Sequence, residues 1–188
     1  MKKSLLPALL FCLAAFEAPA ATLDLDFNDS SVQVGFAHNL REDEYGFSRG
    51  RLRFLYNDHE ETTLGSAGLD FAGSPGNVPG LEVGIGAQLL GGEADRSQDL
   101  LALAVGVQAT WAPPTLGGLG FGGRVSYAPG IFCWMDSERM VESALRVSYA
   151  VTPRAGLFLE YQNIRSDFEE HGNWTIDDGV RGGFEARF

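Results

Sequence analysis

Apolar residues recur at every second position along most of this chain. In "GLEVGIGAQLL" at residues 80–90, Leu81, Val83, Ile85, Ala87 and Leu89 alternate with Glu82, Gly84, Gly86 and Gln88. The same alternation continues through 99–112, 118–128, 139–151 and the last residues, 180–188. A period of two is that of a β-strand, whose successive side chains point to opposite faces. The pattern, with turn residues at intervals of about a dozen, predicts an antiparallel all-β meander.

Ten such strands are predicted, and they could close into a barrel of either ten or eight strands. They cover 22–27, 31–40, 47–57, 63–72, 80–91, 99–112, 118–128, 139–151, 154–166 and 177–188. The first, "TLDLDF", is shorter than the roughly 9 to 11 residues of a membrane strand. An eight-stranded barrel with an irregular N-terminal hairpin is therefore an alternative, and the count is 8 to 10.

The polar face of these strands separates a soluble barrel from a membrane barrel. A soluble, lipid-binding barrel shows water a face rich in Lys, Glu, Asp and Thr. Here the polar face is mostly Gly, Ala, Ser and Gln, with sparse Arg and Glu. Such a face suits a narrow polar interior, and the apolar face then meets lipid. We expect a small transmembrane antiparallel up-and-down β-barrel, with the soluble periplasmic lipid-binding barrel as the weaker alternative.

Aromatic residues on the apolar face are expected near strand ends. They are Tyr56, Phe71, Trp111, Tyr127, Tyr149, Tyr161 and Phe188. Aromatic girdles mark the two interfaces of outer-membrane barrels. Phe188 ends the alternating "VRGGFEARF" and is expected to be the signal that the barrel assembly machinery of the outer membrane recognises.

The N-terminus predicts export. Lys2 and Lys3 precede the apolar run Leu5–Phe16 and the small-residue site Ala18-Pro19-Ala20, which is the pattern of a cleaved signal peptide. We expect residues 1–20 to be this signal peptide and 21–188 the barrel. Without residues 1–20 the net charge is −12 and no lysine remains, which argues against nucleic acid as a partner. Cys133 is then the single cysteine, so it has no internal disulfide partner and is expected to be a shielded thiol.

The connections predict an orientation. "SPGNVPG", "APPTLGG" and "VTPRA" are compact, whereas "YNDHEETT", "GGEADRSQ", "APGIFCWMDSER" and "RSDFEEHGNWTIDD" are longer and acidic. Short periplasmic turns and longer outer loops are typical of outer-membrane proteins, although the acidic "REDEY" falls on the periplasmic side. The expected partners are outer-membrane lipid and lipopolysaccharide. Weak bridging of lipopolysaccharide phosphates to the acidic loops by divalent cations is the alternative to loops that are simply solvated.

No catalytic, cofactor or metal site is predicted. Asp58 with His59, and His171 after Glu169 and Glu170, lie in acidic loops with no rigid nucleophile beside them. The acidic segment of Asp167, Glu169, Glu170, Asp177 and Asp178 lacks the spacing of a calcium loop and is interpreted as solvated. His38 is a lone histidine at a strand end.

The chain from "TLDLDFNDSSVQVGFAHNL" through "PGLEVGIGAQLLGGEAD", "VSYAPGIF" and "LFLEYQNIRSDFEEHG" to "GGFEARF" resembles the YfaZ family of outer-membrane proteins. The resemblance lies in diffuse strand patterns. It implies a small outer-membrane barrel and brings no reaction, ligand or catalytic residue.

Charged side chains are expected to fill the lumen. The polar positions are Arg51, Arg53, Glu82, Gln88, Gln108, Arg124, Glu142, Arg146, Glu160, Gln162, Arg181, Glu185 and Arg187. The turn after Val151 is expected to place Arg146 opposite Glu160, within reach of an ion pair. We expect a barrel with a structural or undefined interaction role and no chemistry. A narrow channel or small-solute pore is the alternative, and the oligomeric state stays open.

Deletion of Phe188 tests the assembly signal. Because the terminal aromatic is expected to be read by the assembly machinery, the shortened protein should be exported but should accumulate uninserted. Protease accessibility of the outer loops on intact cells, compared with the total exported protein, measures this. Normal surface levels of the shortened chain would show that Phe188 is incidental.

Overall fold

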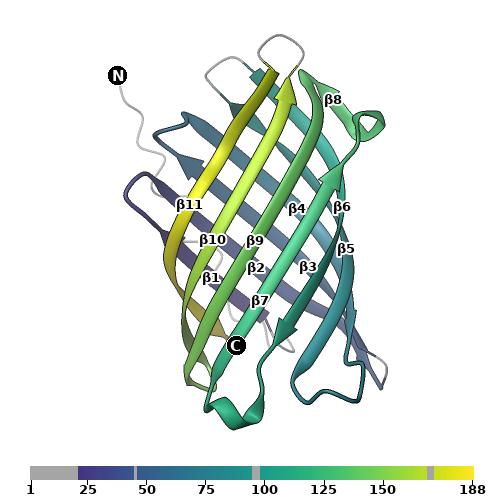
Figure 1. Cartoon of the computed structure of the whole chain (residues 1–188), viewed down its shortest axis with the longest axis vertical. Helices are drawn as coiled ribbons and strands as arrows, with labels where there is room; N and C mark the ends of the chain where they lie inside the picture. Colours follow the sequence, from purple (N-terminus) through teal and green to yellow (C-terminus); the bar gives the residue numbers. More distant parts are fainter. Residues whose placement is uncertain (1–20, 45, 95–97, 169–171) are drawn as a thin grey trace.

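The chain forms a closed barrel of ten antiparallel strands, seen in the computed structural model in Figure 1. The structure describes residues 21–44, 46–94, 98–168 and 172–188. The barrel strands are β1 (Ala21–Phe27), β2 (Ser31–Asp43), β3 (Gly46–Asn57), β4 (Thr62–Gly73), β5 (Leu81–Ala94), β6 (Gln98–Trp111), β7 (Leu119–Ala128), β9 (Ser137–Thr152), β10 (Ala155–Phe168) and β11 (Gly172–Arg187). Each pairs with its neighbours along the chain, and β1 pairs with β11 to close the ring. The expected all-β up-and-down barrel is confirmed.

The short first strand belongs to the barrel. β1 pairs with β2 from Ala21 to Phe27 and with β11 from Thr22 to Phe27. Both ladders are regular, so seven residues are enough to join the first and last hairpins. The count is therefore ten, and the eight-stranded alternative is wrong.

Several strands extend further than the apolar alternation predicts. β5 continues to Ala94, β9 begins at Ser137, and β11 begins at Gly172. A ladder of backbone hydrogen bonds does not require apolar side chains, so pairing continues where the alternation stops. Asp177 and Asp178 were placed both at the start of the predicted strand 177–188 and in the acidic segment interpreted as solvated, and they lie well inside β11. This interpretation was wrong for Asp177, which is buried.

Three short elements complete the fold. The 3-10 helices η1 (Pro114–Leu116) and η2 (Gly130–Phe132) lie in the β6–β7 and β7–β8 connections. The strand β8 (Cys133–Met135) pairs with Leu100–Ala102 of β6 and continues the wall beyond the end of β7. Cys133 is half-buried there. No helix among the described residues is both long and apolar enough to cross a membrane.

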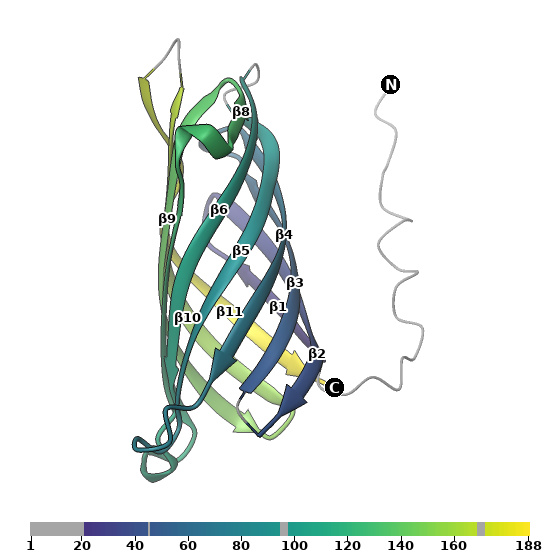
Figure 2. The same ribbon diagram turned by 90° about the vertical axis from the view of Figure 1, so that its right-hand side faces the viewer.

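The two ends of the barrel differ, as Figure 2 shows. We call the end where Ala21 and Phe188 meet the terminal end, and the opposite end the loop end. At the terminal end, the Phe188 amide donates to the Ala21 carbonyl at 2.9 Å. Residues 1–20, the predicted signal peptide, lie outside the described residues.

The outer face of the barrel is a band of exposed apolar side chains. Leu145 is 65% exposed, Ile85 64% and Leu159 60%, and these belong to three different strands. Monomeric soluble proteins rarely expose apolar patches beyond a few hundred Å², so this continuous band identifies a membrane-spanning surface. The aromatic residues expected on this face are all exposed. Tyr161, however, lies in the middle of β10, because β10 extends to Phe168.

The inner face is not polar throughout, contrary to the sequence analysis. At the loop end, a layer of inward apolar side chains contains Leu55, Leu64, Leu90, Ala94, Leu100, Ala102, Ala104, Ala128, Met140, Ile164 and Ile176. Each is 2% exposed or less. We call this set the apolar layer. The members of the layer on β3, β5 and β9 lie an even number of positions along their strands from the inward side chains of Arg53, Gln88 and Glu142, and so they also point inward. The inner face therefore changes from charged to apolar along these strands.

An arginine placed on the lipid-facing surface tests the membrane assignment. Leu159→Arg, near the middle of the band, should destabilise the barrel by about 2–4 kcal/mol in a bilayer. Val151→Arg, at the terminal-end edge of the band, should cost about 0–1 kcal/mol because its charge reaches the interface. Urea unfolding in lipid vesicles measures both. If both variants lose equally little free energy of unfolding, this face contacts water.

Candidate functional site

Three groups of buried charges lie between the apolar layer and the terminal end of the lumen. They are built from alternate residues of the strands, which the pleat points inward. Because several of these side chains are long and reach across the lumen, each group joins strands that are not neighbours in the sheet.

The first group is centred on Glu142 of β9, which is 1% exposed. Arg53 of β3 approaches it with Nη1–Oε1 at 2.5 Å and Nη2–Oε2 at 3.2 Å. Arg124 donates to Oε1 at 2.9 Å, and Gln88 donates to Oε2 at 2.6 Å. Four strands separate β3 from β9 in either direction around the ring. The Arg53–Glu142 pair therefore spans the barrel from wall to wall, and we call it the crossbar.

The second group is centred on Arg181 of β11, whose side chain is fully buried. Its Nε lies 3.2 Å from Asp26 Oδ2, and its Nη1 lies 2.8 Å from Asp177 Oδ2. Asn57 donates to Asp177 at 3.0 Å, and Gln33 donates to Asp26 at 3.2 Å. These residues come from β1, β2, β3 and β11, so the group holds the closing seam of the barrel from inside.

The third group surrounds Arg146 of β9. Its Nε lies 2.6 Å from Glu160 Oε2, and its Nη1 lies 2.8 Å from Asp24 Oδ2 and 4.0 Å from Glu185. Glu160 is directly opposite Arg146 in the β9–β10 ladder, which confirms the predicted register. The guanidinium also stacks 3.9 Å from the ring centre of Phe158, an aromatic inside the lumen.

Phe158 fits inside the lumen because its neighbour on β11 is Gly183. A Cβ at Gly183 would lie 2.5 Å from Phe158 and 2.7 Å from the Asp26 Cβ. Real Cβ atoms do not approach so closely, so this position requires glycine.

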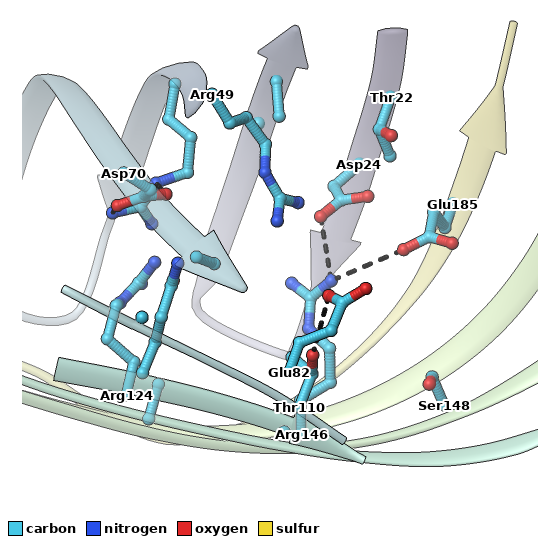
Figure 3. A pocket seen from close by; sticks show the side chains of 18 of the residues that line it. Thr22, Asp24, Arg49, Asp70, Glu82, Thr110, Arg124, Arg146, Ser148 and Glu185 are labelled. Atoms are coloured by element: carbon cyan, nitrogen blue, oxygen red, sulfur yellow. Dashed lines mark hydrogen bonds and ion pairs between the residues drawn. The ribbon is translucent and has the colours of Figure 1, made fainter. Parts of the chain in front are cut away.

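Between these groups and the terminal end lies an open cavity of about 710 Å³. We call it the vestibule. Its walls carry charged side chains from many strands, including Arg49, Arg51, Asp70, Glu82 and Glu185. Figure 3 shows Arg49, Glu82 and Glu185 around the cavity, with the Arg146 pairs on one side and Asp70 on another. Arg51 holds Asp70 with Nε–Oδ2 at 2.5 Å and Nη2–Oδ1 at 3.0 Å.

The structure places the polar residues predicted to fill the lumen on the inner face of the barrel. Arg124, Arg146, Glu160, Glu185 and Arg187 line the vestibule, and Arg187 forms an ion pair with Glu185. Glu142 and Arg181 are buried above it.

Sequence reasoning missed the acidic partners Asp24, Asp26, Asp70 and Asp177. The first two were readable, because they alternate with Leu23 and Leu25 in "TLDLDF". Asp177 keeps the inward parity of Arg181, and it was missed because the acidic segment around it was interpreted as a solvated loop. The register shift between Ile164 and Arg165 in the β10–β11 ladder instead leaves Ile176, one position earlier, without a partner in the pairing.

The acidic and histidine residues weighed for chemistry do not converge. Asp58 accepts a hydrogen bond from Tyr56 and is exposed, as is His59. Asp178 lies on the outer face beside Tyr161, whereas Asp177 lies inside. Within the described ranges no three His, Cys, Asp or Glu side chains gather as metal ligands. Glu169, Glu170 and His171 lie outside the described residues.

Comparison with known proteins finds similarity of fold at low identity. No family model matches the chain, and no curated protein matches its sequence. Similar solved structures include the KdgM porin, at 10% identity and a TM-score of 0.45, covering 90% of this chain and 99% of that chain. The NanC porin has 10% identity and a TM-score of 0.45, with 89% and 97% covered. Pseudomonas aeruginosa OccK3 has 18% identity and a TM-score of 0.45, with 92% of this chain but 54% of that chain covered.

Neutralising Glu142 tests the crossbar. Glu142→Gln leaves two buried guanidiniums without their shared carboxylate, and loss of one partner of a buried pair costs about 3–5 kcal/mol. The free energy of unfolding in lipid vesicles should fall by this amount. Glu138→Gln, at an exposed position of the same strand, should change it by about 0.5 kcal/mol or less. Similar values for the two variants would show that the crossbar contributes nothing.

Proposed function

We propose that this protein is an integral outer-membrane barrel that does not serve as a pore, with a structural or interaction role centred on its vestibule. One observation carries the proposal. The side chains of the apolar layer at the loop end are each 2% exposed or less, so we expect no water-filled path between the vestibule and the loop end.

The apolar layer opposes transport because of what an ion or polar solute would meet there. Leu55, Leu64, Leu90 and Met140 offer no hydrogen-bonding group, and moving a charge into such a region without a partner is very costly. The crossbar below the layer adds a second barrier. Passage would require Arg53 and Glu142 to separate and Leu55 to move aside. A ten-stranded barrel is also narrow, whereas water-filled porins use about 16 to 18 strands.

The predicted contrast between short and long connections does not hold among the described residues. Residues 74–80 and 112–118 at the terminal end are longer than 28–30 and 58–61 at the loop end. The proposed orientation rests instead on Phe188 as the expected assembly signal: a periplasmic Phe188 places the terminal end, and with it the opening of the vestibule, at the periplasm. Lipopolysaccharide is then the lipid around the loop end, the assembly machinery is the partner during insertion, and no chemistry is assigned.

A narrow channel is the second candidate, and the vestibule is the observation that favours it. A cavity of about 710 Å³ occupies the terminal half of the lumen. Displacement of the apolar layer alone would extend it toward the loop end. This channel would be gated and of small conductance.

Planar-bilayer recording distinguishes the two candidates. The purified protein should show no stable conductance steps. Combining Leu55→Ala, Leu90→Ala and Ile176→Ala with Glu142→Gln should open a small conductance, because the variant shortens three members of the apolar layer and weakens the crossbar. Heat-modifiable migration in gels would verify that the variant is folded.

The control carries three alanine substitutions on the lipid face of the same three strands, β3, β5 and β11. Leu52→Ala, Leu89→Ala and Val180→Ala shorten exposed side chains while leaving the lumen intact, so this control should remain closed. Large, stable steps from the unmodified monomer would overturn the proposal in favour of a pore.

A further inference from the structure

We propose that the vestibule binds a small zwitterion, a molecule carrying a carboxylate or phosphate together with an ammonium group. This inference rests on the proposed function, because it takes the vestibule to be a blind site open to the periplasm. Its basis is the pairing of charges in the cavity wall, in which one basic and one acidic side chain make no ion pair within 4.0 Å among the described residues.

The basic side chain is Arg49 of β3. It lines the vestibule, and its guanidinium lies 4.8 Å from the ring centre of Phe47. Its Nε is buried and donates to no acceptor among the described residues. Asp70 is directly opposite Arg49 in the β3–β4 ladder and feels its charge, but both close contacts of the Asp70 carboxylate are with Arg51, so Arg49 keeps its donors for a ligand. A guanidinium presents a planar fork of donors that matches a carboxylate or phosphate. Arg49 is therefore suited to bind the anionic group of a ligand.

The acidic side chain is Glu82 of β5. It also lines the vestibule, and its carboxylate accepts a hydrogen bond from Thr110 at 3.3 Å. Within the described part of the chain no arginine reaches it. Figure 3 shows Arg49 and Glu82 entering the cavity from different strands. An ammonium group of a ligand placed between Glu82 and the vestibule centre would give Glu82 the positively charged partner that no described side chain supplies.

The other charges in the wall are already engaged. Arg124 belongs to the Glu142 group, Asp24 and Glu160 belong to Arg146, and Arg187 belongs to Glu185. Glu42 also lines the cavity, but it is exposed, so water screens its charge. A purely anionic ligand would leave Glu82 unsatisfied and near its own charge, and a purely cationic ligand would do the same with Arg49. A molecule with both charges satisfies both side chains.

The space suits such a ligand. Small-molecule sites occupy about 300–1,000 Å³, and the vestibule has about 710 Å³. Part of this volume exists because Gly122 of β7 faces inward. A Cβ there would lie 3.6 Å from Thr110 and 3.7 Å from Arg146, in ordinary contact. A larger side chain at Gly122 would therefore extend into the cavity without forcing the strands apart.

Binding by the full barrel in lipid nanodiscs, measured by isothermal titration calorimetry at low salt, tests the proposal. The probes are dialanine, its N-acetylated form, which keeps the carboxylate alone, and its C-terminal amide, which keeps the ammonium alone. Dialanine should bind at least 10-fold more tightly than either derivative. Phosphoethanolamine, tested in parallel, distinguishes a lipid headgroup from a peptide as the source of the two charges. The proposal of a zwitterionic ligand is supported if either zwitterion binds more tightly than related probes that keep only one of its two charges.

Two charge variants assign the ends of the ligand. Arg49→Gln should weaken dialanine at least 10-fold and leave the amide unchanged. Glu82→Gln should weaken dialanine at least 10-fold and leave the N-acetylated probe unchanged. If both variants bind all probes as the unmodified protein does, Arg49 and Glu82 are not the site.

A steric pair locates the site independently of charge. Gly122→Leu fills the vestibule and should abolish binding. Gly182→Leu adds the same side chain on the outer face of β11, where its Cβ would lie 3.7 Å from Leu159, and should bind normally. Absence of binding by every probe, or equal binding by the Gly122 variant, would overturn the inference. Because conductance is recorded separately, a closed barrel that binds no probe contradicts this inference alone, and a conducting barrel contradicts the proposed function.

Discussion

Every backbone hydrogen-bonding group inside a bilayer must find its partner within the protein, and the pairing of β1 with β11 is what meets that requirement here. An open sheet of nine or ten strands would leave two edges in hydrocarbon, where each unsatisfied group costs several kcal/mol. β1 has only seven residues, yet it pairs on both sides. The buried Arg181 group lies on the inner side of this seam, with Asp26 from β1 and Asp177 from β11 as its two acidic partners.

Closure with ten strands leads directly to the problem of filling the interior. A ring this small cannot hold a wide aqueous pore, and it is too large to be filled by small residues alone. Two kinds of side chain fill the lumen at different levels along the barrel axis. Near the loop end it uses leucine, isoleucine and methionine, as the core of a soluble protein would. Towards the middle it uses arginine, whose length lets Arg53 reach Glu142 on the opposite wall. The terminal half keeps glycine at inward positions such as Gly122, and the vestibule remains.

Buried ion pairs are weak evidence of stability, because desolvation offsets much of their attraction. Their geometry here is more informative than their energy. Glu142 is shared by Arg53 and Arg124, and Arg146 is shared by Asp24 and Glu160. Such shared contacts link strands that face each other across the lumen, whereas the backbone ladders link only neighbouring strands.

The sequence by itself determined the strands, the face that meets lipid, and the Arg146–Glu160 register. These depend on local alternation and on a single tight turn, so they are readable along the chain. The apolar layer was missed, although Leu55 and Leu90 keep the inward parity of Arg53 and Gln88, because an inward leucine does not differ in type from the lipid-facing leucines next to it. Parity could not place Ile176, because a register shift in the β10–β11 ladder passes over it.

Only the tertiary structure decided which side chains meet across the lumen. Arg53 and Glu142 are 89 residues apart, and nothing in either local segment specifies the other as a partner. Their contact depends on the number of strands, because only a ring of ten places β3 opposite β9. The same closure gathers the apolar layer at one end of the lumen and leaves the vestibule at the other. Alternation specifies which way a side chain points, whereas the circumference of the barrel specifies what it reaches.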